Sequence, residues 1–401
     1  MATNSSGLIS TSHPPIFSLQ RCASWNPFSI ESEPMNANSR LLAGSATFVA
    51  LSAASAIRVR NSVPFSGGRD KAYSSGSMQS TKRGNGRSQS FPYQTRFAHL
   101  PDGPVAYFDE GEGEALLFIH GLVGDFTHFE HVAPAFAKSH RVVGLDLPGC
   151  GISCKPLSRH TIEGYARTVL DLMAHLKLDR ATLVGHSAGA LVASAAAMLA
   201  PRKIDRLTLL GPAGLRRYSR PMRWLAQTIM RPRLLTASLE RLAMPMLNQV
   251  FVTRNEYTEK FIADSLDRPV HPTLGEMAKV FHDLMPDLVS PVLLDRAREL
   301  QIPILVVWGE RDKLICANAV DEVASALPST TFKKVTQCGH MPMIERPAEV
   351  IESLRDFLQR TSSRAPSYGP MSRQRPGPPM SAHPSLDRSL VTSTGAPQGA
   401  A

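Results

Sequence analysis

The five residues Gly185-His186-Ser187-Ala188-Gly189 determine how the rest of the sequence is interpreted. This G-x-S-x-G pattern ends the short apolar run 181–185 and opens the alanine-rich stretch 188–199, which has the composition of a helix. A tight turn from strand to helix holds its serine in a strained conformation with the hydroxyl exposed, and small flanking residues let the neighbouring backbones approach. The helix N-terminus also favours developing negative charge. The pattern therefore predicts that Ser187 is a nucleophile.

Short apolar runs alternate with longer helical stretches on both sides of this pattern. The runs are rich in aliphatic residues, as expected of strands that are buried on both faces. Strands and helices in alternation predict an α/β fold with a mostly parallel, doubly wound sheet. The predicted strands are 115–120, 141–145, 181–185, 204–211, 304–308 and 331–335, and the predicted helices are 161–176, 188–199, 317–327 and 348–359.

The alternation stops after Gly214 and resumes at Gln301, and the sequence between them is helical in character and poor in strands. This interval predicts a helical cap inserted into the sheet domain. The predicted organisation is an extension at 1–90, a core at 91–214 and 301–360, a cap at 215–300 and a tail at 361–401. The tail is short and rich in proline, so we expect no regular structure there.

A serine hydroxyl needs a base to become a nucleophile at neutral pH, and the base needs a group that orients it. Asp312 follows the predicted strand 304–308, at the carboxyl end where catalytic groups gather in open α/β sheets. His340 follows the predicted strand 331–335, and Gly339 permits a turn that aims its ring back over the sheet. These positions predict His340 as the base and Asp312 as the orienting acid, with Glu310 as an alternative acid.

Residues 91–360 resemble an α/β-hydrolase fold protein with a helical cap. The order Ser187, Asp312, His340 along the chain is the order of that family's catalytic triad. Further stretches that resemble the family are Tyr107, Asp109, Gly111 and Gly113 before its third strand, His120-Gly121 after that strand, and Asp146-Leu147-Pro148-Gly149-Cys150-Gly151-Ile152-Ser153 after its fourth.

The resemblance implies an oxyanion hole formed by the backbone N–H groups of Leu122 and Ala188. Such donors contribute about 10²- to 10³-fold to the rate where they have been removed. The family's haloalkane dehalogenases and epoxide hydrolases carry Asp at the position of Ser187, so their chemistry is excluded. The triad needs no cofactor. It needs no metal either, and His128 and His131 match no standard ligand spacing.

The function expected from these residues is that of a serine hydrolase, which cleaves an ester of a moderately apolar small molecule or lipid through an acyl-enzyme. Three alternatives use the same fold. One is hydrolysis of a carbon–carbon bond beside a carbonyl, and another is cofactor-free perhydrolase activity with the same triad. The third is a ligand receptor in which closure of the cap recruits a partner.

The formal net charge of +10 belongs almost entirely to the ends of the chain. Residues 1–90 hold 9 Lys and Arg against 3 Asp and Glu, and residues 361–401 hold 4 against 1. The middle, residues 91–360, is nearly neutral, whereas a nucleic-acid-binding domain would concentrate basic residues on its folded part. We therefore expect no nucleic-acid partner.

Residues 1–90 contain twenty serines, scattered arginines and few acids, which is typical of an organelle transit segment. The Met-Ala start and the serine content favour a plastid address over a mitochondrial one, and a cytoplasmic protein with a disordered extension is the other alternative. The apolar stretch 41–57 is seventeen residues long, whereas a spanning helix needs about 20. It is at best a marginal membrane segment.

The predicted cap begins with a strip of arginines that faces a single acid, Glu240. Such a strip could rest on anionic lipid or admit an anionic substrate, and a solvated basic face explains it equally well. We therefore keep peripheral membrane contact through the basic cap as a hypothesis. The strip consists of Arg216, Arg217, Arg220, Arg223, Arg231, Arg233 and Arg241.

Overall fold

The computed structural model describes residues 92–122, 124–215, 218–229, 231–233, 235–236, 249–267, 273–290, 292–314 and 330–362. The predicted extension at 1–90 lies outside the described residues, as does nearly all of the predicted tail at 361–401. The predicted helix over 317–327 also lies outside them. The remaining predicted elements can be compared with the structure.

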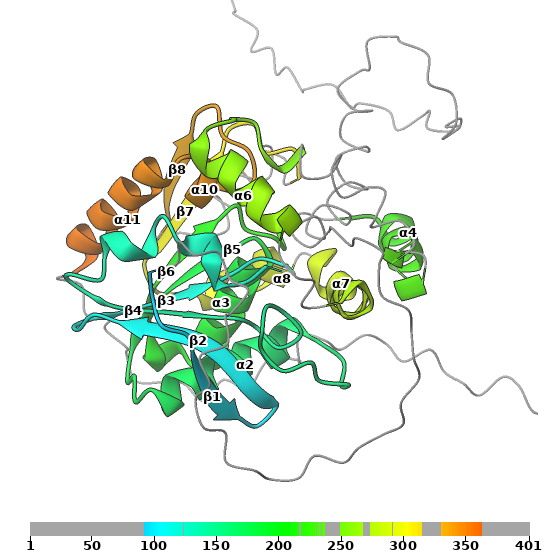
Figure 1. Ribbon diagram of the computed structural model, residues 1–401, viewed down its shortest axis with the longest axis horizontal. Helices are drawn as coiled ribbons and strands as arrows, with labels where there is room; N and C mark the ends of the chain where they lie inside the picture. The colour runs from blue at the N-terminus through cyan, green and yellow to red at the C-terminus, as the bar shows by residue number, and fades with distance from the viewer. Residues whose placement is uncertain are drawn as a thin grey trace, which may run out of the picture.

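A sheet of eight strands forms the centre of the described residues (Figure 1). Its order is β1-β2-β4-β3-β5-β6-β7-β8, with antiparallel pairs only at β1–β2 and β2–β4. The mostly parallel sheet that the sequence predicts is therefore confirmed. The strands are β1 (Arg96–Leu100), β2 (Gly103–Glu110), β3 (Ala115–Ile119), β4 (Arg141–Leu145), β5 (Ala181–His186), β6 (Ile204–Leu210), β7 (Ile304–Gly309) and β8 (Thr330–Val335).

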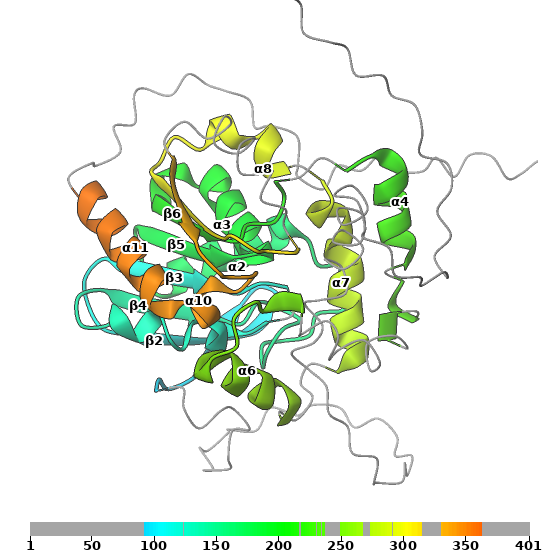
Figure 2. The ribbon, with the colours of Figure 1, turned by 90° about the horizontal axis from the view of Figure 1, so that it is seen from above.

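Helices cover both faces of the sheet (Figures 1 and 2). The helices α2 (Ile162–His175) and α3 (Ala188–Leu199) pack together on one face, and α11 (Pro347–Thr361) contacts β7 on the other. Every residue of β3, β5 and β7 is buried, which is why these segments are continuous apolar runs in the sequence. The doubly wound arrangement is confirmed.

The described residues between the sixth and seventh strands form helices and no strand. The cap helix α7 begins with a capping box between Thr273 and Glu276 and is attached to the core through Asp287, whose carboxylate accepts from the backbone N–H of Ile162 at 3.0 Å. No helix among the described residues is long and apolar enough to cross a membrane. The cap helices are α4 (Arg220–Ile229), α6 (Glu256–Asp267), α7 (Leu274–Leu288) and α8 (Val292–Asp295), and α4 lies outermost, beyond α7 (Figures 1 and 2).

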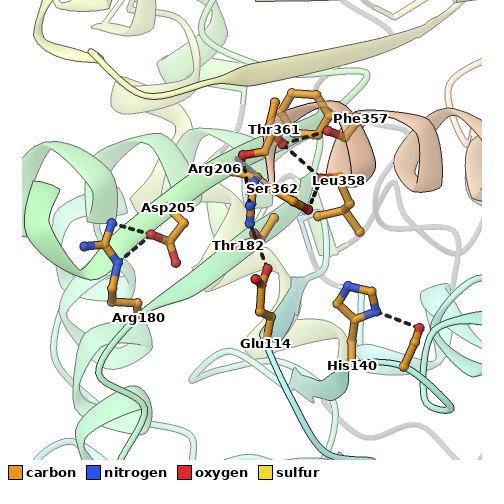
Figure 3. Close-up of polar contacts among 11 residues, drawn as sticks. Glu114, His140, Arg180, Thr182, Asp205, Arg206, Phe357, Leu358, Thr361 and Ser362 are labelled. Atoms are coloured by element: carbon orange, nitrogen blue, oxygen red, sulfur yellow. Dashed lines mark hydrogen bonds and ion pairs between the residues drawn. The ribbon is translucent and has the colours of Figure 1, made fainter. Parts of the chain in front are cut away.

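The amino ends of the parallel strands carry a polar cluster around Arg206 of β6 (Figure 3). The buried Arg206 guanidinium donates to the carboxylate of Glu114 at 3.1 Å and to the carbonyl of Thr361 at 3.2 Å. A cation at the last carbonyl groups of a helix is favourable, so Arg206 holds the C-terminus of α11 against the sheet. A cavity of about 640 Å³ lies beside this cluster, and its walls include Arg141 and Arg180. It is at the opposite edge of the sheet from Ser187.

Candidate active site

Ser187 occupies a sharp turn between β5 and α3, as the G-x-S-x-G pattern predicts. Its φ of 53° and ψ of −115° lie in a region that non-glycine residues rarely adopt, and such a residue stores about 1–3 kcal/mol of strain. A Cβ added at Gly185 would lie 2.4 Å from the carbonyl oxygen of Gly189, and one added at Gly189 would lie 2.3 Å from that of Ile119. The turn therefore requires both glycines.

Ser187, His340 and Asp312 are brought together by three different loops at the carboxyl edge of the sheet. The Oγ of Ser187 lies 3.0 Å from Nε2 of His340, and Nδ1 of His340 lies 2.8 Å from Oδ2 of Asp312. Both partners of the second contact are buried. If Nδ1 donates to the carboxylate, Nε2 is left as the acceptor for the serine hydroxyl, which is the arrangement a general base needs.

The loop that carries Asp312 also fixes its second carboxylate oxygen. Oδ1 of Asp312 accepts from the backbone N–H of Leu314 at 2.8 Å. The alternative acid, Glu310, points elsewhere, since its carboxylate accepts from the backbone N–H of Gln337 at 3.3 Å and lies 3.4 Å from Nζ of Lys334. The hydrogen bond from Gln337 and the nearby Lys334 lower the pKa of Glu310. Glu310 therefore does not orient the histidine in this structure.

The two predicted oxyanion-hole residues, Leu122 and Ala188, line the same small apolar cavity beside Ser187. The cap helix α7 contributes Val280 and Leu284 to its walls. Its volume is about 10 Å³, which is roughly the least that holds one water molecule. This cavity by itself is therefore too small for an acyl chain.

The burial of Ser187 differs from the exposed hydroxyl that the turn predicts. The residue is 3% exposed: the ring of His340 lies 3.0 Å from its hydroxyl, and the cap helix α7 forms part of the wall of the adjacent cavity. A strand-to-helix turn by itself exposes its serine, but the sequence pattern carries no information on how closely an inserted cap sits above it. Burial of Ser187, His340 and Asp312 keeps them from bulk water, which strengthens the electrostatic interactions among them.

The other histidines near the site are packed rather than poised for proton transfer. His186 lies with its ring centroid 4.9 Å from that of His340, and its Nε2 donates to the carbonyl of His340 at 3.0 Å. Burial lowers the pKa of His186 well below its usual value, and the neighbouring His340 and His128 lower it further. His186 is therefore neutral at physiological pH and supports the backbone of His340.

The pair His128 and His131 packs against the cap. His128 meets the ring of Phe261 with centroids 5.4 Å apart, and His131 meets that of Tyr257 at 4.6 Å. Both aromatic partners belong to α6. The spacing of the two histidines is explained by these contacts.

One buried carboxylate near the site was missed by the sequence analysis. Glu345 lies five residues after His340 and is 1% exposed. Its hydrogen-bond partners include backbone groups of the cap about 90 residues earlier in the chain. A glutamate followed by Arg346 and Pro347 is typical of the exposed start of a helix, so no local sequence pattern predicts that Glu345 is buried.

Comparison with known proteins agrees with the fold. Residues 114–347 match the family described as the alpha/beta hydrolase fold. A 2-hydroxy-6-oxononadienedioate/2-hydroxy-6-oxononatrienedioate hydrolase of Pseudomonas putida is 27% identical over 282 residues, which cover 66% of this chain and 96% of the relative. The human monoacylglycerol lipase ABHD6 is 23% identical over 279 residues, which cover 66% of this chain and 82% of the relative.

Solved structures with the same architecture include the enol-lactonase from Burkholderia xenovorans LB400. It is 25% identical to this chain, with a TM-score of 0.57, and the match covers 66% of this chain and all of the lactonase. The family match at 114–347 spans β3 to β8 and the interval that contains the cap.

Proposed function

This chain belongs to the α/β-hydrolase fold family, and from that premise we propose that it is a serine hydrolase of esters. The substrate is an ester of a moderately apolar small molecule or lipid, cleaved through an acyl-enzyme. The observation that carries the proposal is the contact of one histidine with both Ser187 and Asp312, at 3.0 and 2.8 Å. Hydrolases among the relatives support the coarser assignment.

In the proposed reaction, Oγ of Ser187 attacks the ester carbonyl carbon while its proton passes to Nε2 of His340. Asp312 stabilises the resulting imidazolium, and the backbone N–H groups of Leu122 and Ala188 bind the oxyanion. The tetrahedral intermediate expels the alcohol, which takes the proton from His340. Water then attacks the acyl-enzyme with His340 as base, so that the carboxylic acid leaves and the serine is restored.

Two observations support an apolar ester as substrate. The cavity beside the serine is lined by aliphatic side chains from both core and cap, including Leu147, Val192, Val280 and Leu284. Relatives and structural neighbours include a monoacylglycerol lipase and an enol-lactonase, and a lactone is a cyclic ester. Apolar pockets with a few convergent polar groups are typical of small-molecule sites.

A panel of p-nitrophenyl esters with acyl chains of increasing length tests this proposal on the full chain. We expect turnover of at least part of the panel, and loss of turnover in Ser187→Ala. The control is Ser194→Ala on α3, which removes a buried hydroxyl that donates to the carbonyl of Ala190 in the same helix at 2.8 Å. Unchanged turnover in Ser187→Ala would contradict the proposed role of the serine.

Carbon–carbon bond hydrolysis is the second candidate, because the Pseudomonas putida relative is named as a hydrolase of 2-hydroxy-6-oxononadienedioate and 2-hydroxy-6-oxononatrienedioate. The same panel separates the two candidates. A protein that ignores all esters but cleaves a vinylogous 1,5-diketone, with loss of that activity in Ser187→Ala, would favour the second. A ligand receptor would instead bind an apolar ligand without turning it over and would recruit a partner only in its presence.

The outermost cap helix, α4, is proposed to contact an anionic lipid surface. Trp224 is 67% exposed and Leu225 43% exposed on this helix. Of the predicted arginine strip, Arg220 is exposed on α4 and Arg231 is exposed just after it, whereas Arg216, Arg217 and Arg241 lie outside the described residues. Each exposed arginine adds about 1 kcal/mol of attraction near an anionic surface. Aromatic and basic side chains together suit the interface of a bilayer.

Vesicle binding tests this contact. We expect the full chain to sediment with phosphatidylcholine vesicles that contain phosphatidylglycerol, less with pure phosphatidylcholine, and less in high salt. Trp224→Ser should weaken the binding without loss of ester turnover. Equal binding of Trp224→Ser and the unchanged protein would contradict the contact through α4.

A plastid location stays a proposal, with mitochondrion and cytoplasm as alternatives, because residues 1–90 lie outside the described residues. Fusion of these residues to a fluorescent protein tests it. We expect the fusion to enter plastids, and diffuse cytosolic fluorescence would contradict the transit segment.

A further inference from the structure

Glu345 binds two parts of the chain that are distant in sequence. It is the last residue of the short helix α10 (Pro342–Glu345), which follows the loop that carries His340. One carboxylate oxygen, Oε1, accepts from the backbone N–H of Gly339 at 2.8 Å. The other, Oε2, accepts from the backbone N–H groups of Val252 and Thr253, each at 2.9 Å. One buried carboxylate thus joins the histidine loop to the cap.

The cap segment in question, residues 250–255, leads directly into α6 and has further contacts with the same loop. The backbone N–H of His340 donates to the carbonyl of Val250 at 3.0 Å. Nδ2 of Asn255 donates to the carbonyl of Glu345 at 2.9 Å, and the hydroxyl of Thr253 donates to the carbonyl of Gln337. The backbone on either side of His340 is therefore held by the cap.

A carboxylate suits this position because it accepts hydrogen bonds at both oxygens. Burial raises the pKa of Glu345, and the hydrogen bonds from Thr253, Val252, Gly339 and Met341 offset only part of that rise. Charge-assisted hydrogen bonds are stronger than neutral ones and offset part of the cost of burying the group. Glutamine has one acceptor oxygen and would turn its NH₂ toward backbone donors.

We propose that Glu345 is a positioning residue that couples the cap to His340, so that the place of segment 250–255 and the alignment of the imidazole change together. This inference rests on the proposed function of His340 as the base. The cap helix α7 contributes Val280 and Leu284 to the cavity next to Ala188, so a substrate at the serine would meet the cap as well as the core. Through Glu345, a shift of segment 250–255 also shifts the loop that carries His340, and with it the alignment of the imidazole with Ser187.

The test compares Glu345→Gln with Glu352→Gln, a matched change at an exposed glutamate of α11. Misplacement of a catalytic group by about 1 Å costs up to 10²-fold, so we expect kcat for a p-nitrophenyl ester to fall 10- to 100-fold in Glu345→Gln. The KM should change by less than about threefold, because segment 250–255 contributes none of the residues that line the described cavity beside Ala188. Glu352→Gln should behave as the unchanged protein.

Hydrogen exchange supplies a readout that does not depend on turnover. In Glu345→Gln, the peptides that cover 250–255 and 337–341 should lose protection together, while those of β5 should not. The rate at which a fluorophosphonate labels Ser187 should fall with kcat, and the thermal midpoint should show that the protein remains folded at the assay temperature. A protein folded under these conditions with unchanged kcat and exchange would overturn the proposal.

Asn255→Ser gives a second variant if Glu345→Gln does not fold. Serine keeps the N-cap of α6, where Oδ1 of Asn255 accepts from the backbone N–H of Thr258 at 3.0 Å, but its shorter side chain does not reach the carbonyl of Glu345. We expect a smaller fall in kcat with the same gain in exchange at 337–341, and no change in either would overturn the coupling. If the unchanged protein neither cleaves esters nor takes up fluorophosphonate, the proposed function fails, whereas the exchange experiment still tests the link through Glu345.

Discussion

Replacement of Asp312 by asparagine tests the proton transfer that the site is built to perform. The backbone N–H of Leu314 donates to Oδ1 of Asp312 at 2.8 Å, so an asparagine at this position keeps its carbonyl oxygen there. Its NH₂ then faces Nδ1 of His340, which lies 2.8 Å from the present carboxylate. The histidine must accept at Nδ1 and carry its proton on Nε2, where it cannot receive the proton of Ser187.

The expected loss follows from this tautomer. An aspartate-to-asparagine change in a serine triad lowers kcat by about 10⁴, equivalent to about 5 kcal/mol of transition-state stabilisation. Asp312 is buried, so no bulk water can take over the role of the carboxylate. The assay is kcat for a short p-nitrophenyl ester, with the thermal midpoint recorded for each protein.

Glu310→Gln is the matched control, because Glu310 lies two residues earlier in the same loop and bonds only to Lys334 and Gln337 among the contacts that the structure describes. We expect its kcat to stay within about twofold of the unchanged protein. The reasoning is refuted if folded Asp312→Asn keeps more than a tenth of the activity, or if Glu310→Gln loses as much.

Two further predictions concern the turn and the response to acid. Gly189→Ala should destabilise the protein by about 3 kcal/mol or more in denaturant unfolding, since the new Cβ would lie 2.3 Å from the carbonyl oxygen of Ile119. The control Gly275→Ala places its Cβ in open space on α7 and should be neutral or slightly stabilising; equal losses in both would contradict the steric argument. Burial and the nearby Lys279 lower the pKa of His160 from 6.5 to about 4, so the unfolded chain takes up a proton before the folded one as the pH falls. The contribution of His160 to the unfolding free energy should therefore fall by about 1.4 kcal/mol for each pH unit between pH 6.5 and 4. His160→Gln should make the fall of the unfolding free energy with pH less steep, and an unchanged slope would contradict the shifted pKa.

The sheet and its helices were predictable from the sequence, because their signals are local. Strands buried on both faces are continuous apolar runs, and β3, β5 and β7 were found this way within one residue. The helix α3 begins directly after Ser187 and has the predicted bounds. The hairpin of β1 and β2 gave a weaker signal, since the edge strand β1 has one buried residue and β2 has a buried run of only four, Val105–Phe108, and only the family resemblance pointed to it.

The members of the candidate site were predictable individually, and their geometry was not. Asp312 and Glu310 both follow the same strand, so the sequence left the orienting acid open until the contact with His340 resolved it. The role proposed for Glu345 depends on backbone donors more than 90 residues away, and long-range pairings of that kind leave no periodic signal. The closeness of the cap to Ser187 is likewise a property of packing.

The central claim is that Ser187 is the nucleophile, and covalent labelling tests it most directly. The full chain is treated with a fluorophosphonate, digested and analysed by mass spectrometry, in parallel with Ser187→Ala. We expect a single adduct on the peptide that contains Ser187 and no adduct in the variant. The fraction of ester turnover that is lost should equal the fraction of protein that is labelled. A folded protein that cleaves esters while Ser187 stays unmodified, or with the serine replaced, would contradict it.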